Sequence, residues 1–206
     1  MTELFVSALI TFFVAIDPPG CAAIYASMTT DASPAQRRAM AFRAIFVATI
    51  ILLIFGFFGE ALLDAMGVTL DSFRIAGGIM LFIIAIEMVF EKRTERREGR
   101  AQEIIDTPEI EDVSIFPMAM PMIAGPGSIA ALMLFIGRSD GWNEQLVVLA
   151  AMGVILLVML ISMIAAGPLM KIMGQKVETV ITRVLGVILA ALAIQFVVDG
   201  IKASFL

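Results

Sequence analysis

Long apolar runs are the feature of this sequence that most constrains its fold. Six runs of about 18 to 25 residues are each long enough to cross a hydrocarbon layer of about 30 Å. They lie near 4–28, 44–63, 72–90, 114–137, 145–169 and 180–198. The chain is 60% hydrophobic and 16% charged, whereas soluble domains are about half apolar and about a quarter charged. We therefore predict an all-α integral membrane protein with six transmembrane segments.

The stretch between the third and fourth segments, about 91–113, is polar and has mixed charges without an apolar period. It predicts a solvated cytoplasmic linker within a single membrane domain, 1–206, whose halves cover about 1–90 and 114–206. The net charge of −5 argues against nucleic acid as a partner. The chain begins Met-Thr-Glu, without the basic residues that open a signal peptide. The single cysteine, Cys21, excludes an internal disulfide and a cysteine-cluster metal site.

The distribution of Lys and Arg predicts the orientation, because cytoplasmic loops hold the excess of these residues. The linker and the two loops on its side carry 11 of the 14, and the opposite side carries three. This split places both termini outside the cytoplasm. If the fourth segment were a re-entrant loop, the split would be ten against four, so a full crossing is favoured.

The two halves of the sequence resemble one another. The stretch Phe73–Phe90 aligns with Thr182–Asp199, and Pro19-Gly20 matches Pro126-Gly127 at a similar offset. The longer alignment matches Arg74 with Arg183, Gly77 with Gly186 and, after a slip of one residue, Ala85-Ile86-Glu87 with Ala193-Ile194-Gln195. Three spans per half is an odd number, so the second copy enters the membrane from the opposite side. The sequence therefore predicts two inverted three-helix repeats.

Helix breakers interrupt the first and fourth segments near their middles, at Asp17-Pro18-Pro19-Gly20 and at Gly125-Pro126-Gly127. Proline lacks a backbone N–H and clashes with the preceding helical turn, and unpaired backbone in hydrocarbon costs several kcal/mol per group. Such breaks persist inside protein or beside a water-filled cavity. We expect two half-helices to start near the midplane, with partly positive N-termini that converge on an anion such as a carboxylate.

Four polar side chains near these segments have both structural and functional interpretations. Asp17 could act solely as the cap of a half-helix. Alternatively, it could bind a substrate amine or a coupling ion, because a charge within a membrane is costly and therefore favours a functional role. Ser128 could donate to a substrate or cap its helix. Glu87 could anchor its helix at the interface through Lys92 or water, and Gln195 could bond another helix. A proline kink without any ligand stays the alternative for either break motif.

Four stretches carry a resemblance to a known family: "AIDPPG", "FRIAGGIMLFIIAIEM", "PMAMPMIAGPGSIA" and "RVLGVILAALAIQFVVDGI". They resemble the MarC family of bacterial and archaeal multi-pass membrane proteins, grouped loosely with the LysE exporter superfamily. The resemblance implies an inner-membrane transporter, and some members are described as carrying small neutral amino acids such as glycine and alanine. The family pattern adds a proline a few residues after the first break, whereas Ala23 and its neighbours supply none.

We therefore predict a secondary transporter that binds a small solute, such as glycine or alanine, at a midplane site and carries it across the membrane by alternating access. The predicted substrate-binding residues are Asp17, Pro18, Pro19, Gly20, Gly125, Pro126, Gly127 and Ser128. Asp17, Glu87 and Gln195 are candidates for a coupling or secondary role, and Na⁺ or H⁺ is the coupling ion considered. No cofactor, metal or catalytic residue is predicted, and the partners are the solute and the lipid bilayer.

Two other classes of function stay open from the sequence. A channel or a non-transporting membrane scaffold would have the same apolar segments. An intramembrane enzyme is disfavoured, because the chain has no histidine and offers only Glu87 as a second intramembrane acid beside Asp17. The oligomeric state is not indicated by the sequence.

Overall fold

The computed structural model describes residues 1–92, 96, 98–99, 102 and 112–205, and within these residues the chain is helical and contains no strand. Five helices are long and apolar enough to cross a membrane, and a bent pair of helices would supply a sixth span. The expectation of an all-helical chain with membrane-spanning segments is thereby confirmed to the extent of five or six candidate spans among the described residues. The predicted linker, 91–113, lies largely outside the described residues.

The first span consists of two helices, α1 (Thr2–Ile16) and α2 (Pro18–Met28), which meet at Asp17. Asp17 has a left-handed backbone (φ 60°, ψ 66°), its N–H donates to the Phe13 carbonyl, and its carboxylate accepts from the Gly20 N–H. Pro18 occupies the first position of α2, where a helix does not need the missing N–H. The interruption is therefore one residue wide and is closed by the aspartate itself.

Helices α3 (Pro34–Ala65) and α4 (Leu70–Val89) form the second and third spans. The apolar pattern predicted that the second span starts at 44, but α3 begins ten residues earlier. The reason is a capping box in which Ser33 and Gln36 each satisfy a backbone N–H of the other, followed by Pro34 at the first helical position. The start of α3 is thus set by its cap and not by its hydrophobicity.

The fourth segment is more irregular than predicted. It contains η1 (Ser114–Ile123), a wide helical segment, and α6 (Pro126–Gly137), and the two are bent by 51°. Phe116 and Met120 have extended backbones inside η1, because each precedes a proline and the proline ring disfavours helical geometry at the residue before it. The irregular backbone therefore begins well before the predicted break at Gly125.

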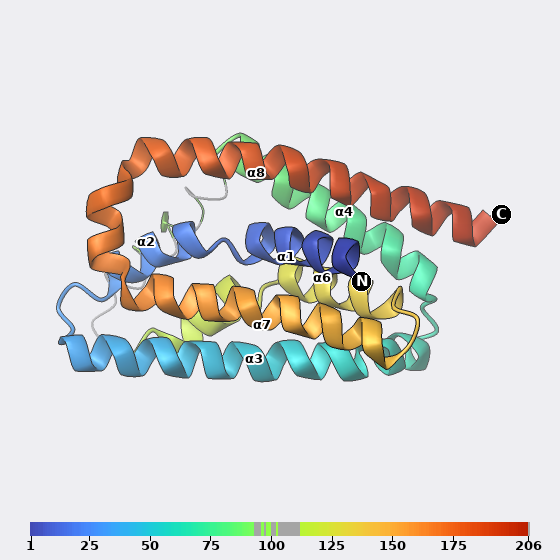
Figure 1. Ribbon diagram of the computed structural model, residues 1–206, viewed down its shortest axis with the longest axis horizontal. Helices are drawn as coiled ribbons and strands as arrows, with labels where there is room; N and C mark the ends of the chain where they lie inside the picture. The colour runs from blue at the N-terminus through green and yellow to red at the C-terminus, as the bar shows by residue number, and fades with distance from the viewer. Residues whose placement is uncertain (93–95, 97, 100–101, 103–111, 206) are drawn as a thin grey trace.

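Helices α7 (Trp142–Ile164) and α8 (Ala166–Phe205) complete the bundle. The fifth span was predicted to reach 169, whereas α7 ends at Ile164 and α8 starts after a single residue. The first part of α8 crosses the end of the bundle, and the rest returns alongside α4 (Figure 1). The part of α8 that qualifies as a span is Val180–Ser204.

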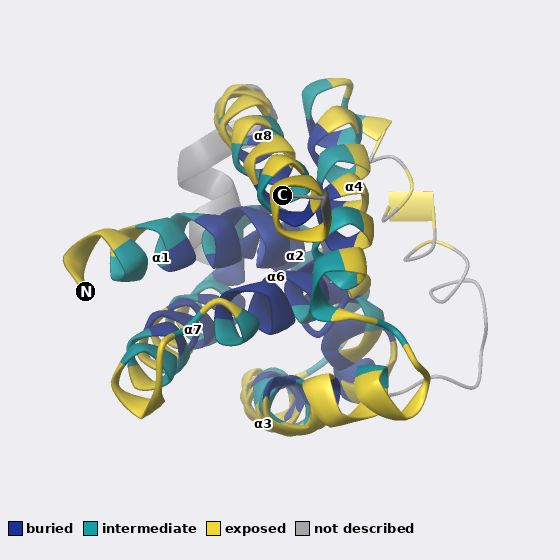
Figure 2. Ribbon diagram, turned by 90° about the vertical axis from the view of Figure 1, so that its right-hand side faces the viewer, coloured by how far each residue is buried: buried dark blue, intermediate teal, exposed yellow. Residues whose placement is uncertain are grey.

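The interior of the bundle is formed mainly by the two helices that follow the break motifs. Helices α2 and α6 lie at its centre, surrounded by α3, α4, α7 and α8, whose outer faces are exposed (Figure 2). In α6 the run from Ala130 to Phe135 is buried, whereas large apolar residues such as Phe46, Leu157 and Val187 are exposed on the surrounding helices. Exposed apolar faces of this kind suit contact with lipid, and they leave α2 and α6 surrounded by protein.

Helices α4 and α8 approach closely through glycines. A Cβ at Gly78 would lie 2.8 Å from the Ala193 carbonyl oxygen, and a Cβ at Gly186 would lie 3.0 Å from the Ala85 carbonyl oxygen. Small residues permit such close packing between membrane helices. The two contacts are reciprocal, because each helix supplies one glycine and one alanine carbonyl.

Candidate functional site

A cavity of about 610 Å³ lies at the irregular part of the fourth segment. Its volume is within the range of sites for small molecules. Its lining comes from α1, α4, η1, the start of α6 and one residue of the 91–113 stretch: Ala15, Ile84, Arg96, Phe116, Pro117, Pro121, Met122, Gly125, Pro126 and Gly127. The cavity therefore combines apolar side chains, the backbone of the second break motif and one cationic side chain.

The N-terminus of α6 forms one wall of this cavity. No side chain caps the helix at Gly125, and Pro126 occupies its first position. The first N–H groups of a helix have no partner within the helix and carry partial positive charge. The backbone here also requires glycine, because a Cβ at Gly125 would lie 2.3 Å from the Pro121 carbonyl oxygen. This end of α6 is suited to an anionic group of a ligand.

Arg96 adds a full positive charge to the cavity lining. Its guanidinium donates to Glu87 Oε1 at 2.7 Å, and both side chains are partly exposed. The second oxygen, Glu87 Oε2, is buried and has no hydrogen-bond partner among the described residues. Glu87, a secondary candidate from the sequence, is thus an ion-pair partner of a cavity-lining residue, and it holds the guanidinium beside the cavity.

The first break motif does not contribute its own side chains to the cavity. Asp17, Pro18, Pro19 and Gly20 are absent from the lining, and Ala15 is the residue of that span that reaches it. Asp17 is 7% exposed, and its carboxylate accepts from the Gly20 N–H at 3.3 Å. The structure thus gives Asp17 a capping contact inside the protein.

Ser128 and Gln195 make hydrogen bonds within the protein. The Ser128 hydroxyl is buried and contacts the Ile123 and Gly125 carbonyls at 2.6 and 3.0 Å, which ties the start of α6 to the preceding turn. Gln195 donates to Asp199 at 2.7 Å on α8. Neither side chain lines the cavity.

Sequence reasoning missed several residues that line the cavity, above all Pro117 and Pro121. The signal was present, because two prolines spaced by four residues in an apolar segment prevent a regular helix on both sides of each ring. Arg96 was also missed, because a charge in a polar stretch gives no sign of the helix against which it will lie.

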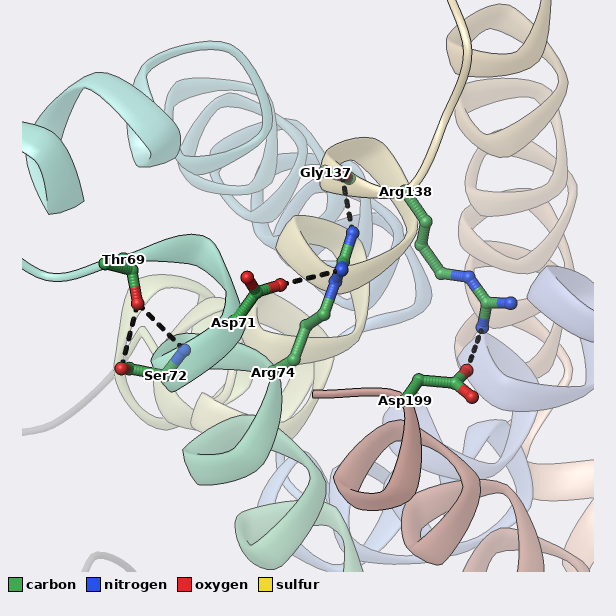
Figure 3. Close-up of polar contacts among 7 residues, drawn as sticks. All are labelled: Thr69, Asp71, Ser72, Arg74, Gly137, Arg138 and Asp199. Carbon is green, nitrogen blue, oxygen red and sulfur yellow. Dashed lines mark hydrogen bonds and ion pairs between the residues drawn. The ribbon is translucent and has the colours of Figure 1, made fainter. Parts of the chain in front are cut away.

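Ion pairs cluster at the two ends of the bundle. At one end Arg43 of α3 pairs with Asp112, which precedes η1, and Arg183 of α8 pairs with Glu91. Burial raises the pKa of the Asp112 carboxyl, but hydrogen bonding from Ser114 and the nearby Arg43 outweigh it and lower the pKa below its usual range. At the other end, named the Gly137 end, charged side chains of α4 and α8 lie beside Arg138, the residue that follows α6 (Figure 3).

The chain was compared with known proteins. The model of the MarC family of integral membrane proteins matches residues 2–205. A UPF0056 membrane protein of Archaeoglobus fulgidus is 36% identical over 97% of this chain and 92% of the relative. The UPF0056 membrane protein YhcE of Escherichia coli is 33% identical over 95% of this chain and 91% of the relative, and MJ1677 of Methanocaldococcus jannaschii is 30% identical over 99% and 98%.

No solved structure matches the chain. The relatives are named as membrane proteins and come from bacteria and archaea, which agrees with the helical spans described above. The match to the family model extends over nearly the whole sequence, both break motifs included. This chain belongs to the MarC family of integral membrane proteins.

Proposed function

We propose that this chain is a secondary transporter of a small solute with a carboxylate group, most simply glycine or alanine, which it binds in the cavity. The observation that carries the proposal is the pairing, in one cavity of about 610 Å³, of the uncapped N-terminus of α6 with the Arg96 guanidinium. A carboxylate is the small anion that both groups bind well. Ile84, Phe116 and Met122 supply apolar surface for a short side chain.

An inverted repeat would give this site alternating access, and the packing of the helices supports one. Helices α1 and α2 contact α7, just as η1 and α6 contact α3. Likewise α6 contacts α4, as α2 contacts α8, while α4 and α8 contact one another. Exchanging the two halves of the chain leaves the contact between α4 and α8 unchanged and turns each of the other contacts named here into another of them. Two inverted repeats related by a two-fold axis in the membrane plane have this property.

The reciprocal glycine contacts between α4 and α8 support the same symmetry. The sequence alignment matches Gly77 with Gly186 and, after its slip, Ala85 with Ala193. The observed contacts join Gly186 to Ala85 and Gly78 to Ala193, which is the same pair of positions within one residue. In this proposal α4 and α8 lie next to the symmetry axis, and the interrupted spans flank the solute.

Counterflow in proteoliposomes tests the transport function directly. Liposomes loaded with one unlabelled small neutral amino acid are diluted into a trace of the same labelled compound, with and without a sodium gradient. We expect saturable accumulation of label for glycine or alanine. Flux that does not saturate and shows no counterflow would indicate a channel, and absence of flux for every compound would refute transport of small neutral amino acids.

A further inference from the structure

The C-terminal end of α6 is held at the Gly137 end by arginines that bridge α6 to two other helices. Arg74 of α4 donates to the Gly137 carbonyl at 3.2 Å and pairs with Asp71 at 2.9 Å. Arg138, which follows α6, lies 3.7 Å from the Asp199 carboxylate of α8 and stacks over the Phe196 ring. Figure 3 shows the Arg74 side chain directed toward Gly137 and the Arg138 side chain directed toward Asp199. Together these contacts close this end of the bundle.

Arg74 is incompletely satisfied in this arrangement. Its Nε is buried and has no hydrogen-bond partner among the described residues. A guanidinium has five N–H donors in a fork that fits both oxygens of a carboxylate, and a buried donor without a partner costs free energy. The Asp71 pair uses one terminal nitrogen of Arg74, and the Gly137 carbonyl uses the other. Arg74 therefore has the capacity for a further carboxylate contact.

The residue after Asp199, Gly200, packs against Arg74 across the contact between α4 and α8. A Cβ built on Gly200 would lie 3.1 Å from the Arg74 Cβ. At the opposite end of the bundle the equivalent residues of the two halves are paired already, since Arg183 of α8 donates to Glu91, which follows α4, at 2.7 Å. The alignment of the halves matches Arg74 with Arg183, and its slip matches Glu91 with Asp199. The same ion pair is thus within reach at the Gly137 end.

We propose that Arg74, Arg138 and Asp199 form a gate at the Gly137 end, in which Asp199 exchanges Arg138 for Arg74 when α6 moves away. Withdrawal of α6 removes the Gly137 carbonyl from Arg74 and Arg138 from Asp199. The two groups left behind then pair, as Arg183 and Glu91 do at the opposite end. Asp199 keeps a cationic partner in both arrangements, so neither one leaves its charge unpaired, and the two are discrete states.

The gate rests on the proposed transport function, and α6 connects the two. Pro126 and Gly127 at the start of α6 line the cavity, while Gly137 at its end is held by Arg74. A helix moves largely as one rigid element, so a solute that draws in the start of α6 also displaces its end. Opening of the gate is therefore coupled to occupation of the cavity.

Thiol labelling tests the gate without any solute. On a Cys21→Ala background, Leu134→Cys reports separation of α6 from α4, because Leu134 packs against Gly77 in the closed arrangement. Ala131→Cys, which is also buried in α6, is a second reporter with a smaller change in volume. A membrane-impermeant thiol reagent is applied from the side on which Ser139→Cys is labelled. The labelling rate is normalised to that of the denatured protein.

Arg138→Gln removes a contact that only the closed gate makes, so we expect labelling to be about two- to fivefold faster, as fits a partly exposed ion pair. Arg138→Lys keeps the charge and should retain the wild-type rate. The double variant Arg138→Gln/Arg74→Gln distinguishes two roles of Arg74. Arg74 either pairs with Asp199 in the open gate or only holds the end of α6 through the Gly137 carbonyl in the closed gate. If Arg74 stabilises the open gate, the double variant is labelled more slowly than Arg138→Gln.

If the double variant is labelled faster than Arg138→Gln, Arg74 only holds the closed gate through Gly137. That result would overturn the proposed exchange of Arg138 for Arg74 at Asp199. A wild-type rate in Arg138→Gln at both reporters would overturn the gate itself. Because no amino acid is present in the assay, these results are independent of the counterflow screen. A chain whose gate responds as expected but which carries no amino acid would retain the gate and lose the proposed substrate.

Discussion

Asp17 has a conformational role that Asn could share and a charge that Asn could not. Its backbone is left-handed, a region that Asp and Asn tolerate better than other residues with a side chain. Its carboxylate accepts the Gly20 N–H as an N-cap, which Asn does about as well. The charge is therefore unnecessary for the helix junction, and its presence within a span favours a second role.

The variant Asp17→Asn separates these roles. Because it preserves the shape and the cap, we expect normal expression and thermal stability. If the charge holds a coupling ion or a substrate amine, apparent affinity should fall about ten- to a hundredfold, which corresponds to about 1.5–3 kcal/mol. The measurement is counterflow with and without sodium and proton gradients, with the exposed Asp31→Asn as the matched control. Unchanged transport with unchanged ion dependence would reduce Asp17 to a cap.

Arg96 is the second residue whose charge can be tested alone. In Arg96→Gln the cavity loses its guanidinium and Glu87 loses its partner, so the half-saturating concentration of solute should rise about tenfold or more. Arg43→Gln is the control, because Arg43 is similarly exposed and ion-paired but does not line the cavity. Equal effects of the two substitutions would argue against a binding role for Arg96.

At the scale of elements, the site depends on a backbone that cannot form a regular helix. Pro117 and Pro121 impose extended residues within η1, and Gly125 allows the chain to pass the Pro121 carbonyl before α6 starts. These irregular turns leave the N-terminus of α6 facing a cavity instead of continuing a helix. The prolines and the glycine thus shape the site through the main chain, without a polar side chain of their own.

Gly125→Ala tests this backbone. The added methyl would meet a backbone oxygen at 2.3 Å, so the turn must shift, and overpacking of this kind costs about 1–3 kcal/mol. We expect a lower melting temperature in detergent and loss of counterflow. Gly153→Ala in α7 is the matched control, because nothing lies within 4 Å of its added Cβ and alanine favours a helix. Wild-type stability and transport in Gly125→Ala would contradict the close approach described here.

At the scale of the whole molecule, the arrangement divides the helices by their surroundings. Helices α2 and α6, which follow the break motifs, occupy the interior, and α3, α4, α7 and α8 present apolar faces outward (Figure 2). Irregular backbone is tolerated in a membrane only when protein or water surrounds it, so this division is what allows the breaks to exist.

The orientation of the whole bundle is tested by labelling single cysteines. On a Cys21→Ala background we expect Ser139→Cys, and cysteines added at either terminus, to react with an impermeant reagent from outside the cytoplasm. The reason is the excess of Lys and Arg at the opposite end. Arg38→Cys, at that opposite end, serves as the control and should react from the cytoplasmic side only. Labelling of Ser139→Cys from the cytoplasm alone would invert the topology.

The sequence alone determined the membrane class, the approximate spans and the positions of both break motifs. These properties are local: the length of an apolar run decides whether it can cross a bilayer, and proline and glycine act on the backbone next to them. Only the tertiary structure decided that Gly125, Pro126 and Gly127 line the cavity while Asp17 does not. It also decided that Arg96 from the polar stretch reaches that cavity, and that Arg138 and Asp199 meet across α6 and α8. Such pairings depend on how the faces of distant helices come into register, and one helix's own sequence does not contain that information.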